Sequence, residues 1–219
     1  MRVAILALYR ATAAGAFADG TASGIFKTPV AGPVQVGREG LDGDFHADRS
    51  VHGGPDQALH HFPAEHYPPL AAAFPRAAAA LVPGSIGENL TTHGLAEHDV
   101  CIGDVYAVGA VRLQVTAPRR PCWKIDRRYD ARGMAAHIIA AGLTGWYYRV
   151  LDGGWLEAGA PLECVERPAQ APSVAAFHAA LRATRPPAEV LERLAALAAL
   201  PVAWQRRLRA RLDWLRRHP

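Results

Sequence analysis

Apolar and polar residues in the first 167 positions alternate mostly with a period of two, which is typical of strands. Segment 104–118, DVYAVGAVRLQVTAP, alternates on both sides of Gly109 and therefore predicts a hairpin that turns at this glycine. Segment 145–166 predicts a second hairpin, which turns at the Asp-Gly-Gly of residues 152–154.

Two helices are expected within this strand-rich body. One begins at Pro63 in segment 62–74. Pro68 and Pro69 are expected to interrupt it, because proline cannot donate a helical hydrogen bond. The other covers residues 132–142 and is closed by Gly142. The body is therefore predicted to be mostly strand with a few helices.

The pattern changes to a helical period after residue 167. A linker at 168–173 is followed by three helical segments, which are separated by prolines, and Ser173 suits the N-cap of the first. In the second and third segments the apolar residues recur at i, i+3, i+4 and i+7, namely Val190, Leu191, Leu194 and Leu197, then Trp204, Leu208, Leu212 and Leu215.

We therefore divide the chain into a body, residues 1–167, and a C-terminal three-helix region, residues 168–219. A region of about 50 residues can hardly be stable alone. We expect it to dock on the body or on a second subunit, and a homodimer is plausible for this reason.

The formal charge of +4 follows the same division. Residues 1–167 hold 15 basic and 17 acidic side chains, a net of −2, whereas residues 168–219 hold 9 and 3, a net of +6. A basic tail indicates an acidic partner or a solvated helix face. Nucleic-acid binding through the arginines of 204–217 is the disfavoured alternative, because docking better explains the apolar stripe on that helix.

The cysteines and the hydropathy indicate a cytoplasmic protein without a membrane partner. Cys101, Cys122 and Cys164 lie far apart and form no C-x-x-C pair, which argues against a disulfide framework and a zinc ribbon. No stretch approaches 18 uninterrupted apolar residues, and the N-terminal apolar run has no cleavage site after it.

Cys122 lies in the stretch APRRPCWK. Pro121 fixes its own φ and pushes Arg120 out of helical space, so the cysteine is expected on a stiff loop at the end of a strand. Neighbouring cations, here Arg119, Arg120 and Lys124, depress a thiol pKa and favour the thiolate that attacks or ligates a metal. The alternative is a buried, inert cysteine.

Five of the ten histidines fall within residues 46–66, at spacings that match no zinc motif. Within 52-HGGPD-56, Gly53 and Gly54 let the backbone pass close to a bound group and offer bare amides of the kind that bind anions. A plain turn is the alternative. We assign no function to His60 and expect most of this cluster to be ordinary surface.

Two further loops carry candidate polar residues. Segment 83–95, PGSIGENLTTHGL, lacks the lysine of a P-loop and reads as a polar loop lining a cleft. Lys27 lies in a loop bounded by glycine and proline. It and Lys124 are the only two lysines in the chain. An ammonium group can approach a single oxygen as a point charge.

Together these stretches resemble the MOSC-domain proteins of the YiiM-like branch. The resemblance spans nearly the whole chain and is carried by 24-GIFKTPV-30, 41-LDGDFHADRSVHGGPDQAL-59, 65-EHY-67, 87-GENL-90, 101-CIGDVY-106 and 117-APRRPCWK-124. It implies an α+β fold with a mainly β, MOSC-type β-barrel core in residues 1–167 and a three-helix appendage in residues 168–219.

The resemblance also implies an activity. MOSC domains of this branch bind the molybdenum cofactor (molybdopterin), with Cys122 here as the protein ligand to molybdenum. They are associated with reducing N-hydroxylated bases such as 6-hydroxylaminopurine, with electrons from a separate flavoprotein or iron–sulfur protein. A carrier of sulfur or of the cofactor, with a persulfide on Cys122, is the alternative.

Roles for the remaining site residues follow from the same resemblance. His52 is the expected proton donor, since its unperturbed pKa lies near working pH. The cofactor's phosphate and the thiolate would be supported by Lys27, Arg119 and Lys124, and further hydrogen bonds would come from Gly53, Gly54 and Asn89. Arg120 fills the variable place of the PRxPC motif, where a second arginine could alter phosphate contacts or substrate preference.

Overall fold

The structure of the protein is a computed structural model that describes residues 1–11, 15–49 and 52–218. The strands are β1 (Arg2–Arg10), β2 (Thr28–Pro29), β3 (Val34–Gly37), β4 (Gly40–Leu41), β5 (Leu59–His61), β6 (Leu90–Thr92), β7 (Val105–Val108), β8 (Val111–Pro118), β9 (Trp146–Asp152), β10 (Gly154–Leu156) and β11 (Pro161–Glu166). The helices are η1 (Pro55–Gln57), η2 (Ala64–His66), α1 (Tyr67–Ala73), η3 (Pro75–Ala80), α2 (Trp123–Arg128), α3 (Met134–Ala141), α4 (Val174–Arg182), α5 (Ala188–Ala195) and α6 (Val202–Arg217).

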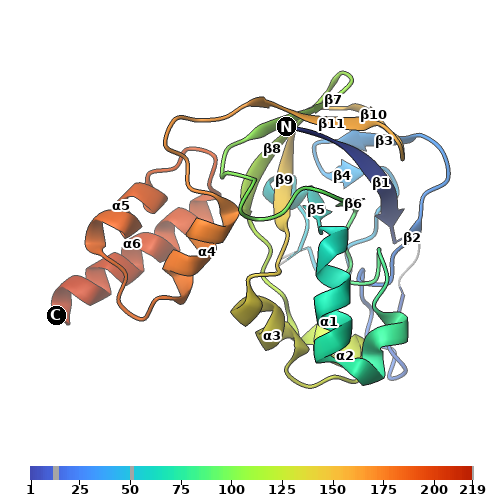
Figure 1. Cartoon of the computed structure of the whole chain (residues 1–219), viewed down its shortest axis with the longest axis horizontal. Helices are drawn as coiled ribbons and strands as arrows, with labels where there is room; N and C mark the ends of the chain where they lie inside the picture. The colour runs from blue at the N-terminus through green and yellow to red at the C-terminus, as the bar shows by residue number, and fades with distance from the viewer. Residues whose placement is uncertain (12–14, 50–51, 219) are drawn as a thin grey trace.

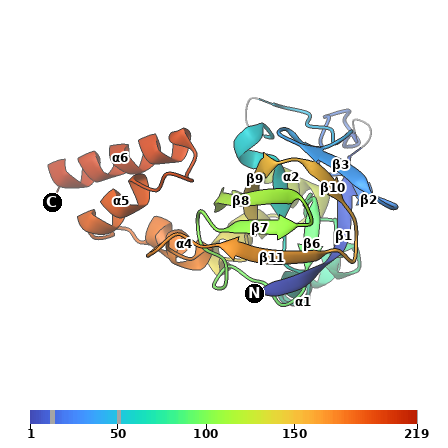
Figure 2. The same cartoon turned by 90° about the horizontal axis from the view of Figure 1, so that it is seen from above.

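Seven strands form a closed barrel in the order β11-β7-β8-β9-β5-β6-β1, and β1 closes it by pairing with β11 (Figure 2). The pairing of β5 with β6 is parallel, while the other pairings in the barrel are antiparallel. Strands β10, β3 and β4 form a small separate sheet. The barrel together with the helices confirms the predicted α+β fold with a mainly β barrel core.

The first predicted hairpin is confirmed and the second is wrong. Strands β7 and β8 pair on either side of Gly109, which has a φ of 56°. After β9, however, β10 pairs with β3, and β11 pairs with β7 and β1. The backbone at Gly153 passes so close to β3 that a Cβ there would lie 2.7 Å from the Val36 oxygen. The glycines therefore carry the chain onto β3 instead of folding it back on β9.

The prolines of segment 62–74 start a helix rather than interrupt one. Pro63 precedes η2, and Pro68 and Pro69 occupy the first turn of α1, where amide hydrogens have no helical acceptor. Helix α3 ends at Gly142 in a left-handed conformation, φ 75°, as the sequence predicts. No helix in the described ranges is long and apolar enough to cross a membrane.

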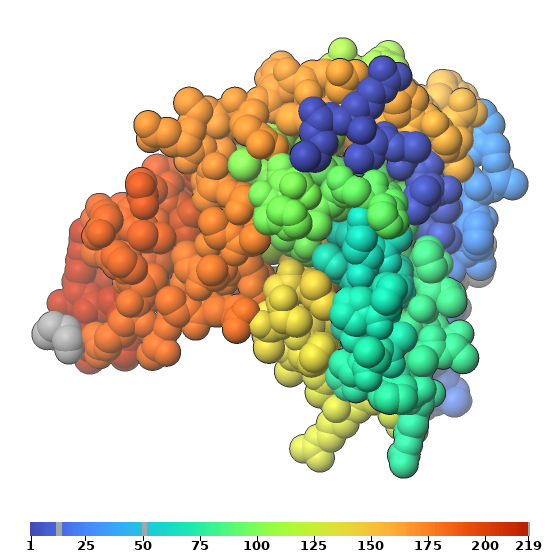
Figure 3. Space-filling model, in the orientation of Figure 1, coloured from blue at the N-terminus to red at the C-terminus, as the bar shows by residue number. Residues whose placement is uncertain are grey.

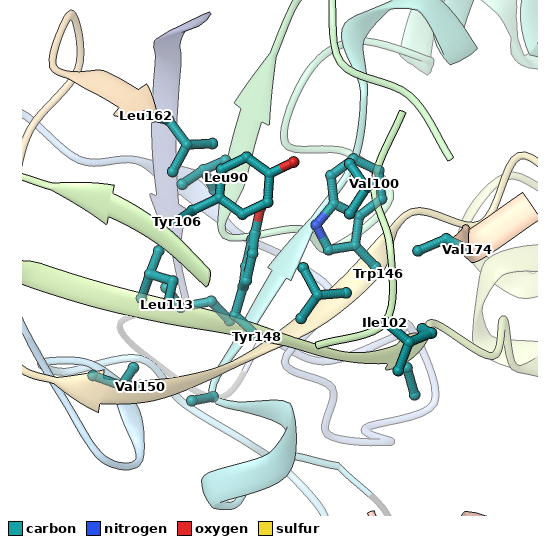
Figure 4. Packing of buried hydrophobic residues seen from close by; sticks show 14 of the residues in the cluster. Leu90, Val100, Ile102, Tyr106, Leu113, Trp146, Tyr148, Val150, Leu162 and Val174 are labelled. Carbon is teal, nitrogen blue, oxygen red and sulfur yellow. The ribbon is translucent and has the colours of Figure 1, made fainter. Parts of the chain in front are cut away.

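Large apolar side chains fill the barrel, with Tyr106, Trp146 and Tyr148 at its centre (Figure 4). The same buried cluster continues into the C-terminal helices through Phe177 of α4, Leu191 of α5 and Leu208 of α6. Helix α4 packs on β8, and α5 packs on α4 and on α6, so the three helices lie together beside the barrel (Figure 1).

The junction between body and helices is also tied by the backbone. The Val174 amide donates to the Val100 oxygen at 2.7 Å, and Ser173 caps α4 by accepting from the Ala176 amide at 3.0 Å. The expected docking on the body and the expected cap are confirmed. A domain boundary at residue 167 stays a prediction.

Candidate functional site

A small hollow of about 80 Å³ lies beside the end of the barrel where β8 ends and β9 begins. Segments far apart in the sequence meet there, and seven of the eight predicted site residues line it: Lys27, His52, Gly53, Asn89, Arg119, Cys122 and Lys124. Gly54 follows Gly53 but is not among the lining residues. The sequence did not point to five polar residues of the wall, namely Ser23, His46, Gln57, His60 and Tyr147.

Cys122 lies on the rim of this hollow, half-buried, between the barrel and α2. It is the N-cap residue of α2 and has an extended backbone, with φ −117° and ψ 167°. At the start of its loop the Arg119 amide donates to the Gly145 oxygen at 3.1 Å, which fastens the loop to the beginning of β9. The thiol is therefore held on a loop whose two ends are fixed by secondary structure.

Arg119 places a buried guanidinium beside the thiol. Arg119 is only 8% exposed, and its Nη2 donates to the Ile86 oxygen at 3.4 Å. Burial raises the pKa of Tyr147, and the charge of Arg119 opposes that rise, so the two side chains are close neighbours. Nη1 of Arg119 is buried and has no hydrogen-bond partner among the described residues. Such a group is costly unless an acceptor is bound to it.

Lys27 is held by a carboxylate behind the wall. Its Nζ lies 2.6 Å from Oδ2 of Asp44, and the two side chains are only 4% and 1% exposed. Burial lowers the pKa of Lys27, and Asp44 opposes this shift. The Asn89 amide donates to the same carboxylate at 2.7 Å and to the Tyr9 oxygen at 3.2 Å. Both amide hydrogens of Asn89 are therefore already used within the protein.

The histidines of segment 46–66 are not ordinary surface, and that expectation is wrong. None of the five is exposed, and His60, His61 and His66 are buried. They fall on β5, η2 and loops that pack between the barrel and the hollow. Periodicity could not reveal this burial, because β5 contributes only three residues to a sheet covered on both faces.

Three histidines line the hollow, and burial lowers the pKa of each. For His52 the positive charges of Arg119 and Lys124 add to the effect of burial. His60 is fully enclosed and its Nε2 is 3.3 Å from the Thr144 oxygen. His46 lies over Gly53, where an added Cβ would be 3.0 Å from the imidazole and φ is 77°. All three imidazoles are therefore neutral at pH 7.

The remaining two cations of the motif point in different directions. Lys124 lines the hollow and donates to the Ala22 oxygen at 3.3 Å. Arg120 does not line it, because its guanidinium lies 5.8 Å from the centre of the Trp204 ring on α6. Adjacent residues of an extended chain point to opposite sides. Support of the thiolate by Arg120, expected from the sequence, is therefore wrong.

The chemistry of the hollow suits an anion that carries a soft metal. Its lining contains the ammonium groups of Lys27 and Lys124, the guanidinium of Arg119 and one thiol, but no acidic side chain. No group of three or more His, Cys, Asp and Glu that could hold a metal occurs within the described residues. A metal at Cys122 would therefore need further ligands from a molecule bound with it.

Comparison with known proteins gives the following matches. Residues 48–163 match the MOSC domain family. The chain is 42% identical to protein YiiM of Escherichia coli over 152 residues, 69% of this chain and 68% of that protein. It is 37% identical to a protein named "Reductase" from Gibberella moniliformis over 155 residues, which cover 70% of this chain but only 28% of that protein.

Solved structures agree with these matches. The crystal structure of YiiM from Escherichia coli superposes with a TM-score of 0.81 at 32% identity, covering 97% of this chain and 92% of that one. YiiM from Geobacillus stearothermophilus superposes with the same TM-score and identity, covering 96% and 99%.

Proposed function

The chain belongs to the MOSC domain family, and on this premise we propose that it is an oxidoreductase that binds the molybdenum cofactor at Cys122 and reduces N-hydroxylated compounds such as 6-hydroxylaminopurine. One observation carries the proposal: a single thiol faces a hollow with three cationic side chains and no acidic one. A soft metal prefers a thiolate, and a phosphorylated pterin needs cations.

The residues of the hollow fit this cofactor. The unpartnered Nη1 of Arg119 is a buried donor that a phosphate or pterin oxygen would satisfy. Lys124 at the rim would serve the same group, while Lys27 belongs to the wall and is fixed by Asp44, which lies behind it. When bound, the cofactor supplies the two-electron redox change at the metal.

The protein's own residues must then handle two protons, since N–OH + 2e⁻ + 2H⁺ gives N–H and H₂O. Tyr147 keeps its phenolic proton at neutral pH, and burial raises its pKa further, so its hydroxyl can donate to a substrate oxygen. His52 has a lowered pKa and is neutral at pH 7. It would therefore relay a proton from solvent rather than hold one in advance.

The fungal relative named a reductase supports the oxidoreductase class. The matched segment is 28% of that protein, so most of its chain lies outside the shared domain. The electrons here would accordingly come from a separate redox protein, a flavoprotein or an iron–sulfur protein, as the resemblance implies.

The test is to measure molybdenum content and reduction of 6-hydroxylaminopurine for the purified protein and two variants. Cys122→Ala should lose both while keeping the wild-type circular dichroism spectrum. Cys164→Ala, which removes a half-buried thiol on β11 far from the hollow, should keep both. Full activity of Cys122→Ala would contradict the assignment.

The same preparation distinguishes the carrier alternative. A sulfur carrier would release cyanide-labile sulfur from Cys122 and contain no molybdenum. A cofactor carrier would contain molybdenum but not reduce 6-hydroxylaminopurine, so molybdenum together with that activity favours the reductase.

A further inference from the structure

A second hollow, of about 350 Å³, lies between the body and the C-terminal helices. Figure 3 shows a notch between α3 and the C-terminal helices, coloured yellow and orange to red. We call this hollow the arginine groove, defined by Arg120 after β8, Ile139 of α3, Arg182 of α4, and Trp204, Arg207 and Arg211 of α6. It is distinct from the hollow at Cys122.

The arginine groove gathers positive charge without compensation. No acidic residue lines it. Arg120 and Arg207 share the Trp204 ring, at 5.8 Å and 5.4 Å from its centre, and burial together with the charge of Arg207 lowers the pKa of Arg120. Like charges held this close repel one another. An anionic group between them would relieve that repulsion.

Most of these arginines have no structural task that would explain their position. Arg211 donates to backbone oxygens of Leu181 and Thr184 and so fastens the end of α4. In the part of the chain that the structure describes, by contrast, no ion pair involves Arg120, Arg182 or Arg207. They are exposed and available to a partner.

The floor of the arginine groove is apolar. It contains Ile139, 37% exposed, together with Leu181 and the half-buried ring of Trp204. Arginine and tryptophan around an apolar centre are the residues enriched at protein interfaces. Double-stranded nucleic acid would need a continuous basic stripe, whereas these cations converge on a concave surface.

The arginine groove adjoins the candidate active site through one segment of chain. Arg119 lines both hollows, and Arg120 turns into the groove two residues before Cys122. A partner seated in the groove would therefore contact the outer side of the loop whose inner side carries the thiol.

We propose that the arginine groove binds the acidic face of the redox protein that supplies electrons to the site at Cys122. This inference rests on the proposed function. For each N–OH reduced to N–H, two electrons arrive, one from each of two reduced iron–sulfur partners or in two one-electron steps from reduced flavin, while two protons are taken from solvent and one water leaves. Encounters of this class use small interfaces that charge complementarity steers.

The experiment compares two double variants of the holoenzyme that change the net charge equally. Arg182→Glu/Arg207→Glu reverses two cations of the arginine groove. Arg206→Glu/Arg209→Glu reverses two exposed arginines of α6 that do not line it. Reduction of 6-hydroxylaminopurine is measured with reduced methyl viologen, and then with two acidic protein donors, a reduced plant-type [2Fe–2S] ferredoxin and a reduced flavodoxin.

With methyl viologen all three proteins should be equally active. With at least one protein donor, the groove variant should lose on the order of tenfold in kcat/KM at low salt, and the control at most about twofold. Equal losses in both variants, or wild-type protein that accepts electrons from viologen but from neither donor, would reject the inference. A wild-type protein that does not reduce 6-hydroxylaminopurine even with methyl viologen would instead contradict the proposed function.

Binding gives a second readout that does not depend on activity. The wild-type protein should bind oxidised ferredoxin or flavodoxin with an affinity that falls as salt rises, and the groove variant should bind more weakly than the control. Tighter binding of a DNA duplex than of either protein through the same two arginines would also reject the inference.

Discussion

At the scale of single residues, Asp44 determines the electrostatics of the site without lining it. Its carboxylate contacts the Lys27 ammonium and the Asn89 amide, and it accepts from the Ala11 amide at 2.8 Å. The hollow can therefore present cations to a ligand while the compensating charge stays behind the wall. Removing one partner of a buried ion pair leaves the other uncompensated.

We expect Asp44→Asn to lower the free energy of unfolding by about 3–5 kcal/mol, because the buried Lys27 ammonium loses its counter-charge. Urea denaturation measures the change. The exposed Asp42→Asn should stay within about 0.5 kcal/mol of wild type, and adding Lys27→Met to Asp44→Asn should recover part of the loss. A loss as small as that of the control would show that the pair does not matter to stability.

Buried histidines predict how stability depends on pH. Burial lowers the pKa of His52, His60 and His61, so the unfolded chain binds more protons than the folded one just below the ordinary histidine value of about 6.5. This contribution to stability is therefore present above the unfolded pKa of about 6.5 and is lost as the pH falls from there toward the lower folded-state pKa values.

His61→Gln tests this dependence away from the site. Both nitrogens of His61 are bonded, to Tyr148 and to Thr92, and burial lowers its pKa well below the ordinary histidine value, so the histidine is neutral in the folded barrel at neutral pH. Between pH 6.5 and 5 the variant should lose stability less steeply than wild type, by up to about 1.4 kcal/mol per pH unit. Urea midpoints at several pH values give both slopes, and parallel slopes would contradict the reasoning.

At the scale of elements, capping of α4 decides how firmly the C-terminal helices begin. Ser173→Ala should cost about 1 kcal/mol, because the Ala176 amide loses its acceptor. For a chain of this size that corresponds to a fall in Tm of about 2–4 °C. Ser173→Asp, which keeps a capping oxygen, should melt near wild type, and equal melting of all three proteins would show that the cap is dispensable.

Sequence reasoning succeeded where local chemistry decides the structure. The hairpin at Gly109, the end of α3 at Gly142 and the cap at Ser173 each depend on residues within one turn of the chain. The stiff approach to Cys122 was likewise predictable from Pro121. Seven of the eight predicted site residues line the hollow at Cys122. They were selected from distant segments through the family resemblance, because periodicity carries no information on which segments meet.

The failures concern contacts between distant segments. The turn at residues 152–154 gives no local sign that β10 will pair with β3. Helix α2 has six residues and one buried side chain, too little for a helical period to show. Tyr147 and His60 reach the hollow from β9 and β5, and only the barrel's closure places them beside Arg119.

At the scale of the whole molecule, the barrel and the C-terminal helices share one core. Phe177 is completely buried in the cluster that also contains Val100 and Ile102. The helices should therefore unfold together with the barrel rather than before it.

We expect Phe177→Ala to lower the free energy of unfolding by about 3–5 kcal/mol and to leave a single transition. Far-UV circular dichroism and tryptophan fluorescence should report the same midpoint. Glu189→Ala, on an exposed position of α5, serves as the control and should change little. A separate early transition for the helices would show that they fold as an independent unit.

The pairing of β1 with β11 has a consequence for biosynthesis. The first strand leaves the ribosome early but cannot complete its hydrogen bonds until residues 161–163 have been translated. Non-local pairing of this kind is slow and leaves a strand edge open in the meantime. The nascent chain therefore has a period in which chaperones can bind it, and the barrel closes only after residues 161–163 have been translated.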